Sequence, residues 1–209
     1  MDNGHAYHSK EVRWFSTDKP DQLEQWFNRY ATNLEESSER TDFYLSMSPQ
    51  DNISYKLREG RTEIKLRESP METITFPNGH AGKADKWVKW SLGLREPVND
   101  PGLLYNIPGN NFIAIKKKRI LVIFEILPDE TLQQVIGTNL PDEGCEVELT
   151  YIDHDSKRWY SFALEAFCIE ALLDHNFYLV TTKVLREIND IILEEKDSYS
   201  YPVFLEMNF

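Results

Sequence analysis

The chain has 209 residues, of which 41% are hydrophobic, and its formal net charge at pH 7 is −12. This length and apolar content can bury the core of one domain, which we expect to span residues 1–209. The acidic balance excludes general nucleic-acid binding, because such binding needs a basic surface that displaces counterions from phosphates.

Apolar residues do not form a run long enough to cross a membrane or to act as a secretory signal. The most apolar run, at residues 120–127, is short and is interrupted by Glu125. We therefore expect a cytoplasmic protein that does not bind membranes. Cys145 and Cys168 are isolated, and the histidines lack the paired spacing of metal ligands, so we expect neither a disulfide framework nor a zinc site.

The first predicted strand covers residues 10–16 and alternates along its length. Glu11, Arg13 and Phe15 share one face, and Val12 and Trp14 share the other.

An amphipathic helix is predicted next, with Asp18 as its cap and Pro20 near its start. Apolar residues recur there at a spacing of three to four: Leu23, Trp26, Phe27, Tyr30 and Leu34.

After a predicted strand at residues 41–47, the stretch ISYKLREGRTEIKLRE at residues 53–68 predicts a hairpin with a turn at residues 59–61. Charged and polar residues share one face of each strand: Ser54, Lys56 and Arg58, then Glu63, Lys65 and Arg67. The opposite faces are mainly apolar. The alternation fits charges that face water over an apolar core, and it equally fits charges that line a closed barrel.

The middle of the chain reads as a loop that becomes a strand through Trp87, Lys89 and Ser91, followed by a long loop at residues 95–111. Residues 111–127 predict one long or two short strands, because Ile, Val and Phe dominate without a helical stripe.

A short helical turn is predicted after Pro128. Residues 145–153 and 158–168 then predict a hairpin in which Glu146 and Glu148 share a face and Glu165 aligns with Ser161. Residues 169–180 and 181–196 look helical, and residues 201–207 are predicted to form a last strand. The order of elements indicates an α+β fold: an antiparallel, eight-stranded closed barrel with packed helices.

The motifs KLREG and TEIKLRE, with the later CEVELTYI and FALEAF, resemble the strands of the CYTH superfamily, the triphosphate tunnel metalloenzymes. This resemblance implies a barrel whose basic side chains hold a triphosphate and whose glutamates hold Mg²⁺ or Mn²⁺. The implied phosphate-binding residues are Lys56, Arg58, Lys65, Arg67 and Arg119. Glu11 and Glu148 are the implied metal ligands, and Glu63, Glu146 and Glu165 are further acidic tunnel candidates.

The first strand departs from the family pattern Glu-x-Glu-x-Lys. Arg13 stands in place of the second glutamate and Phe15 in place of the lysine, so that Glu11 alone matches. A guanidinium in place of a carboxylate changes the local charge by two units and disfavours a bound cation there.

We expect a tunnel protein that binds a phosphate-rich anion, and three functions stay open. The first is a metal-dependent hydrolase of a triphosphate or polyphosphate. The second is a protein that binds a phosphate-rich small anion, which includes nucleotides, without turnover. The third is a noncatalytic barrel kept as a scaffold for protein contacts, in which the opposite charges neutralise one another.

Overall fold

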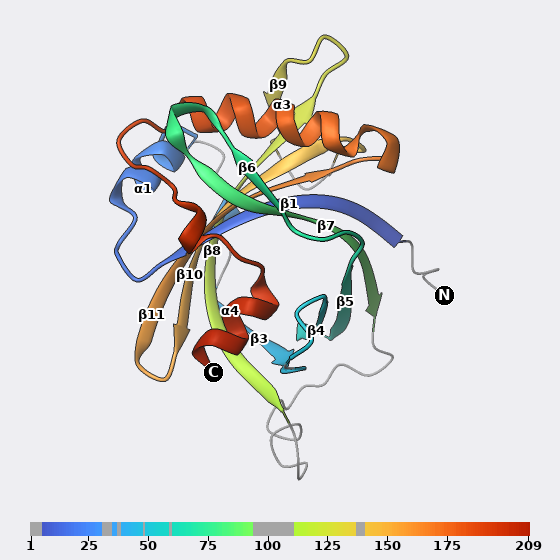
Figure 1. Ribbon diagram of the computed structural model, residues 1–209, viewed down its shortest axis with the longest axis vertical. Coiled ribbons are helices and arrows are strands. Elements are labelled where there is room, and N and C mark those ends of the chain that lie inside the picture. Colours follow the sequence, from blue (N-terminus) through green and yellow to red (C-terminus); the bar gives the residue numbers. More distant parts are fainter. Residues whose placement is uncertain are drawn as a thin grey trace.

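A computed structural model describes residues 6–30, 35–36, 39–47, 49–58, 60–93, 111–136 and 141–209. The barrel strands are β1 (Ala6–Ser16), β3 (Arg40–Leu45), β4 (Ile53–Arg58), β5 (Arg61–Arg67), β7 (Ala81–Gly93), β8 (Phe112–Ile126), β10 (Gly144–His154) and β11 (Lys157–Phe167). They pair antiparallel in the order β1-β11-β10-β8-β3-β4-β5-β7, and pairing of β7 with β1 closes the ring (Figure 1). The expected eight-stranded closed barrel is confirmed.

Three short strands extend the barrel wall. The strands β2 (Glu35–Glu36) and β9 (Leu132–Gln134) pair with β8, and β6 (Glu72–Thr75) pairs with β7. The described helices are α1 (Asp21–Asn28), α3 (Leu173–Arg186) and α4 (Tyr201–Asn208). In the described part of the chain, no helix combines the length and the apolarity needed to cross a bilayer.

The main hydrophobic core lies outside the barrel, between its wall and the helices α1 and α3. Val12 and Trp14 point outward from β1 into this core, as the alternation predicted. Side chains from β8, β10 and β11 join them, including Val122, Val147 and Leu164. Burial of each such side chain contributes about 1.5–3 kcal/mol. This wall therefore has an apolar outer face, and its inner face is free to carry charge.

A second, smaller core closes one end of the barrel. Phe15 points inward there and stacks on Phe204 of α4, with 4.4 Å between the ring centroids. Inward side chains of other strands, among them Tyr44 and Trp159, belong to the same cluster. In Figure 1 the red helix α4 lies across this end of the ring. The expected strand at residues 201–207 is wrong: Pro202 fits the first turn of a helix, and aromatic packing outweighs β-propensity.

Other element boundaries also differ from the expectation. Pro20 occupies the N-cap position of α1 and no side chain caps the helix, so the role expected of Asp18 is wrong. A turn after Pro128 leads into β9 and not into a helical turn. Leu34 and nearly all of the long loop expected at residues 95–111 lie outside the described residues.

One helix, α3, replaces the two that were expected between residues 169 and 196. Polar side chains contact the C-terminal end of α3 and the segment that follows it. The Asn78 amide donates to the Leu185 carbonyl oxygen at 3.2 Å, at the C-terminal end of α3. The His80 ring then accepts the Leu193 N–H at 3.2 Å and hydrogen-bonds the Ile188 carbonyl at 2.9 Å, which holds the following segment in an irregular path.

Candidate functional site

The charged faces of the β4–β5 hairpin point into the barrel. Lys56, Arg58, Glu63 and Lys65 line an internal cavity of about 480 Å³. Side chains of barrel strands alternate between the inside and the outside, so the intervening apolar residues of the hairpin face outward. Of the two orientations that the alternation allowed, the structure has the one that lines a closed barrel.

Eight basic and six acidic side chains line this cavity. The basic ones are Arg13, Arg40, Lys56, Arg58, Lys65, Lys89, Lys117 and Arg119. The acidic ones are Glu11, Asp42, Glu63, Glu146, Glu148 and Glu165. The lumen therefore has a basic excess inside a chain whose formal net charge is −12. The cavity volume falls within the range of roughly 300–1,000 Å³ that is typical of small-molecule sites.

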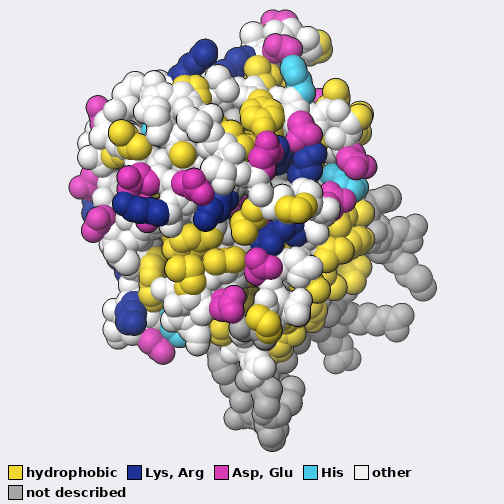
Figure 2. Space-filling model, viewed as in Figure 1, with side chains coloured by type: hydrophobic (Ala, Val, Ile, Leu, Met, Phe, Trp, Pro, Cys, Tyr) yellow, Lys and Arg dark blue, Asp and Glu magenta, His cyan; other side chains and the backbone are white. Residues whose placement is uncertain are grey.

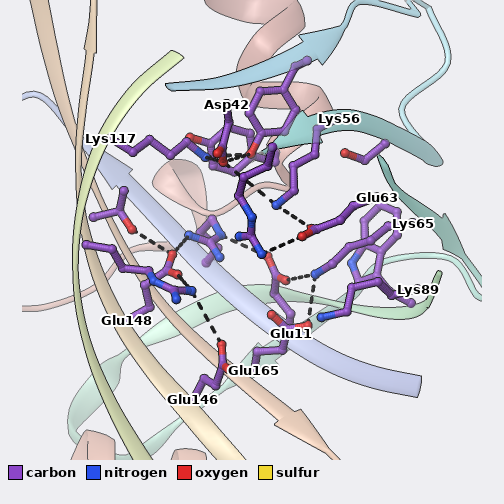
Figure 3. A pocket seen from close by; sticks show the side chains of 18 of the residues that line it. Glu11, Asp42, Lys56, Glu63, Lys65, Lys89, Lys117, Glu146, Glu148 and Glu165 are labelled. Atoms are coloured by element: carbon purple, nitrogen blue, oxygen red, sulfur yellow. Dashed lines mark hydrogen bonds and ion pairs between the residues drawn. The ribbon is translucent and has the colours of Figure 1, made fainter. Parts of the chain in front are cut away.

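Arg13 lies between Glu11 and Glu148, two of the lumen carboxylates that Figure 3 labels. Its Nε donates to Glu11 Oε1 at 3.0 Å, and its Nη1 donates to Glu148 Oε1 at 2.8 Å. Burial of the guanidinium opposes its charge, but Glu11 and Glu148 outweigh this and raise the pKa of Arg13 well above its usual value. Arg13 and Arg119 likewise hold the pKa of the buried Glu148 carboxyl well below its usual value.

A second charged group joins β4 to β5. The Glu63 carboxylate contacts Lys56 Nζ at 2.8 Å and Arg58 Nη2 at 2.6 Å. Burial alone would raise the pKa of Glu63, but the two cations outweigh it and lower that pKa to about 2. Glu63 therefore stays ionised at neutral pH and keeps both basic side chains directed into the lumen.

A third group surrounds Asp42, which is fully buried on β3. Arg40 Nε lies 3.2 Å from Asp42 Oδ1, and Lys117 Nζ lies 3.6 Å from Asp42 Oδ2. Lys117 also donates to Tyr44 Oη at 2.7 Å and lies 3.7 Å from the centroid of the Tyr201 ring. Burial lowers the pKa of Lys117 well below its usual value, although the charge of Asp42 opposes this.

Glu146 and Glu165 lie opposite each other in the register of β10 and β11. Lys65 Nζ donates to Glu165 Oε1 at 3.0 Å, and Arg119 Nη1 lies 4.0 Å from Glu146 Oε2. Burial and the neighbouring Glu165 raise the pKa of Glu146. Burial also opposes the charge of Glu165, but Lys65 outweighs this and lowers the pKa of Glu165, so the pKa values of the two facing carboxyls shift in opposite directions.

Most residues singled out in the sequence line the cavity: Lys56, Arg58, Lys65, Arg119, Glu11, Glu63, Glu146, Glu148 and Glu165. Arg67 does not. Its Nε lies 2.7 Å from Asp85 Oδ1 and its Nη2 donates to Ser200 Oγ at 3.0 Å, so its side chain is held at the barrel wall beside the start of α4.

Sequence reasoning missed several lumen residues, above all Asp42, Tyr44 and Lys117. For Lys117 a signal exists: it lies two residues before Arg119 and must share its face in a strand. For Asp42 and Tyr44 the same spacing shows only that they share a face. The short strand around them does not reveal which face is inside.

A divalent metal does not fit between Glu11 and Glu148, because Arg13 already bridges them. A divalent cation roughly 4 Å from a guanidinium would be repelled by about 8 kcal/mol at an effective dielectric constant of about 20. Within the described ranges, no three or more His, Cys, Asp or Glu side chains are grouped so that they could hold a metal ion. The expected Mg²⁺ or Mn²⁺ site at Glu11 and Glu148 is therefore not supported by the residues around it.

Comparisons with known proteins find only distant structural similarity. Neither a family model nor a curated protein matches the sequence. Among solved structures, the PH1012 protein of Pyrococcus horikoshii OT3 matches with a TM-score of 0.45 and 10% identity, over 92% of this chain and 98% of that one. The Pct1 RNA triphosphatase of S. pombe, solved in complex with the Spt5 CTD, matches with a TM-score of 0.41 and 11% identity, over 89% of this chain and 83% of that one. The chain's own strand order and lining residues show an antiparallel barrel closed around a charged cavity.

Proposed function

We propose that the barrel binds a phosphate-rich small anion, such as tripolyphosphate or a nucleoside triphosphate, in its lumen. The observation that carries this proposal is the convergence of eight basic side chains on one internal cavity of a strongly acidic chain. Several positive groups in an enclosed, weakly screened space favour a ligand with several closely spaced negative charges. The resemblance of the hairpin motifs to the tunnel family supports the same class of ligand.

Lys56 and Arg58 are the leading phosphate-binding residues in this proposal. Both contact the Glu63 carboxylate, which directs them into the lumen. A phosphate oxygen accepts their hydrogen bonds either in place of Glu63 or beside it. Lys65 and Arg119 are held in the same way by Glu165 and by Glu148. Because the acidic partners fix the geometry before binding, little side-chain entropy is lost when the anion enters.

Tripolyphosphate binding by the Arg58→Ala variant tests the proposal. Charge-assisted hydrogen bonds to an anion contribute about 1.5–3 kcal/mol each, so the affinity of this variant should fall at least about tenfold. Lys116→Ala is a matched control, because Lys116 lies on the outer surface with 52% of its side chain exposed. Isothermal titration of the three proteins in EDTA gives the comparison.

Equal affinity of wild type and Arg58→Ala would contradict binding in the lumen. Absence of tripolyphosphate binding by the wild type would favour the scaffold function instead. Phosphate release is measured on the same samples after metal is added. Metal-dependent release by the wild type would indicate a hydrolase.

A further inference from the structure

Arg13 lies where two strands bring a pair of carboxylates together. Its guanidinium joins Glu11 on the same strand to Glu148 on β10, through contacts of 3.0 and 2.8 Å. The same Nη1 atom donates to Ser161 Oγ at 3.0 Å, and the guanidinium lies 5.6 Å from the centroid of the Tyr201 ring. Only 8% of the Arg13 side chain is exposed, so it is built into the wall of the lumen.

The two carboxylates have basic partners on their other oxygens as well. Lys65 Nζ donates to Glu11 Oε2 at 3.1 Å (Figure 3), and Arg119 Nη1 donates to Glu148 Oε2 at 3.2 Å. All four oxygens thus accept a hydrogen bond from a basic side chain. A metal ion could coordinate these oxygens only if it displaced the donors, and a buried guanidinium without its carboxylates is strongly unfavourable.

We infer that Arg13 is a resident cation that takes the place of a divalent metal between Glu11 and Glu148, and that the lumen therefore binds its anion in metal-free form. The part of this inference that concerns the anion rests on the proposed function. An anion that carries magnesium would bring a second cation close to Arg13, whereas the free anion adds no cation to this part of the lumen. Arg13 thereby determines which form of the ligand is bound.

Binding of manganese without any anion tests the role of Arg13 directly. Mn²⁺ titration followed by electron paramagnetic resonance should detect no lumen site in the wild type. The Arg13→Gln variant leaves Glu11 and Glu148 facing each other without the guanidinium, and should bind one Mn²⁺ at least about tenfold more tightly than any site of the wild type. Arg40→Gln, which removes a lumen cation beside Asp42, is the matched control and should gain no site.

A manganese site in the wild type that is lost in Glu148→Gln would overturn the inference. So would an Arg13→Gln variant that folds and binds Mn²⁺ no better than the wild type. Should Arg13→Gln not fold, the wild-type titration still decides, together with Arg13→Lys, which keeps the positive charge and should also exclude the metal.

Tripolyphosphate affinity with and without magnesium tests the choice of ligand form. Wild-type affinity in EDTA should equal that in metal-free buffer, and excess magnesium should weaken it about fivefold or more by converting the anion to its complex. Stronger binding with magnesium would overturn the inference. Absence of tripolyphosphate binding in every buffer would contradict the proposed function instead. The manganese titration contains no anion, so it would still test whether Arg13 excludes a metal ion.

Discussion

Glu63 shows at the residue scale how buried charge contributes to stability. The pKa of this carboxyl is about 2 in the folded barrel, against an ordinary value of 4.5. A carboxyl with a depressed folded pKa stabilises the fold above its unfolded pKa, and this stabilisation is lost as the pH falls through the folded pKa. The window for Glu63 thus extends from about pH 4.5 down to about pH 2.

The Glu63→Gln variant should therefore lose roughly 3 kcal/mol of unfolding free energy at pH 7. It should also show a weaker decline of stability with acid across that window. Urea unfolding of both proteins at a series of pH values measures this, with the exposed Glu170→Gln as control. Parallel pH profiles for wild type and Glu63→Gln would show that the cations do not hold Glu63 ionised.

Single residues also mark the limit of what the sequence can reveal. In the run Lys116-Lys117-Lys118, adjacent side chains of one strand lie on opposite faces, and the lysines themselves do not say which face is inside. The structure exposes 52% of the Lys116 side chain and 7% of the Lys117 side chain. In β4 and β5 the alternation of apolar and charged residues defines two faces, but it left the direction of these faces open, and the structure shows that the charged faces point inward.

At the scale of elements, strands were easier to predict than helices. The barrel strands repeat a period of two that survives in any environment, so their existence and most of their bounds could be read from the sequence. The nature of α4 could not, because its aromatic residues suit a strand equally well. The helix depends on a residue far away in the sequence. Phe15 points into the end of the barrel, and α4 packs on its ring.

The packing of α4 predicts a large effect of Phe204→Ala. Phe204 is fully buried against Phe15 and Trp159, and removal of such a ring costs about 3–5 kcal/mol of unfolding free energy. Met207→Ala on the same helix, at a side chain that is 64% exposed, should change stability by less than about 0.5 kcal/mol. Urea unfolding checks both. Similar values for the two variants would mean that α4 is not anchored in the barrel end.

At the scale of the whole molecule, the usual placement of charge and apolar surface is reversed within the barrel. The larger apolar core lies between the outer wall and the helices, and the lumen holds paired charges. On the face shown in Figure 2, acidic and basic side chains are interspersed around apolar ones. Under the proposed function, the enclosed basic side chains attract the polyanion, because the overall charge of the chain has the wrong sign.

Thermal unfolding with tripolyphosphate in EDTA tests this account most directly. A ligand at about one hundred times its dissociation constant stabilises the native state by about 2.7 kcal/mol, which is about 5–10 °C for a chain of this size. We expect such a rise in wild type without added metal, relative to sodium chloride at equal ionic strength. No rise, or a rise that appears only when magnesium or manganese is added, would contradict metal-free binding of a phosphate-rich anion in the lumen.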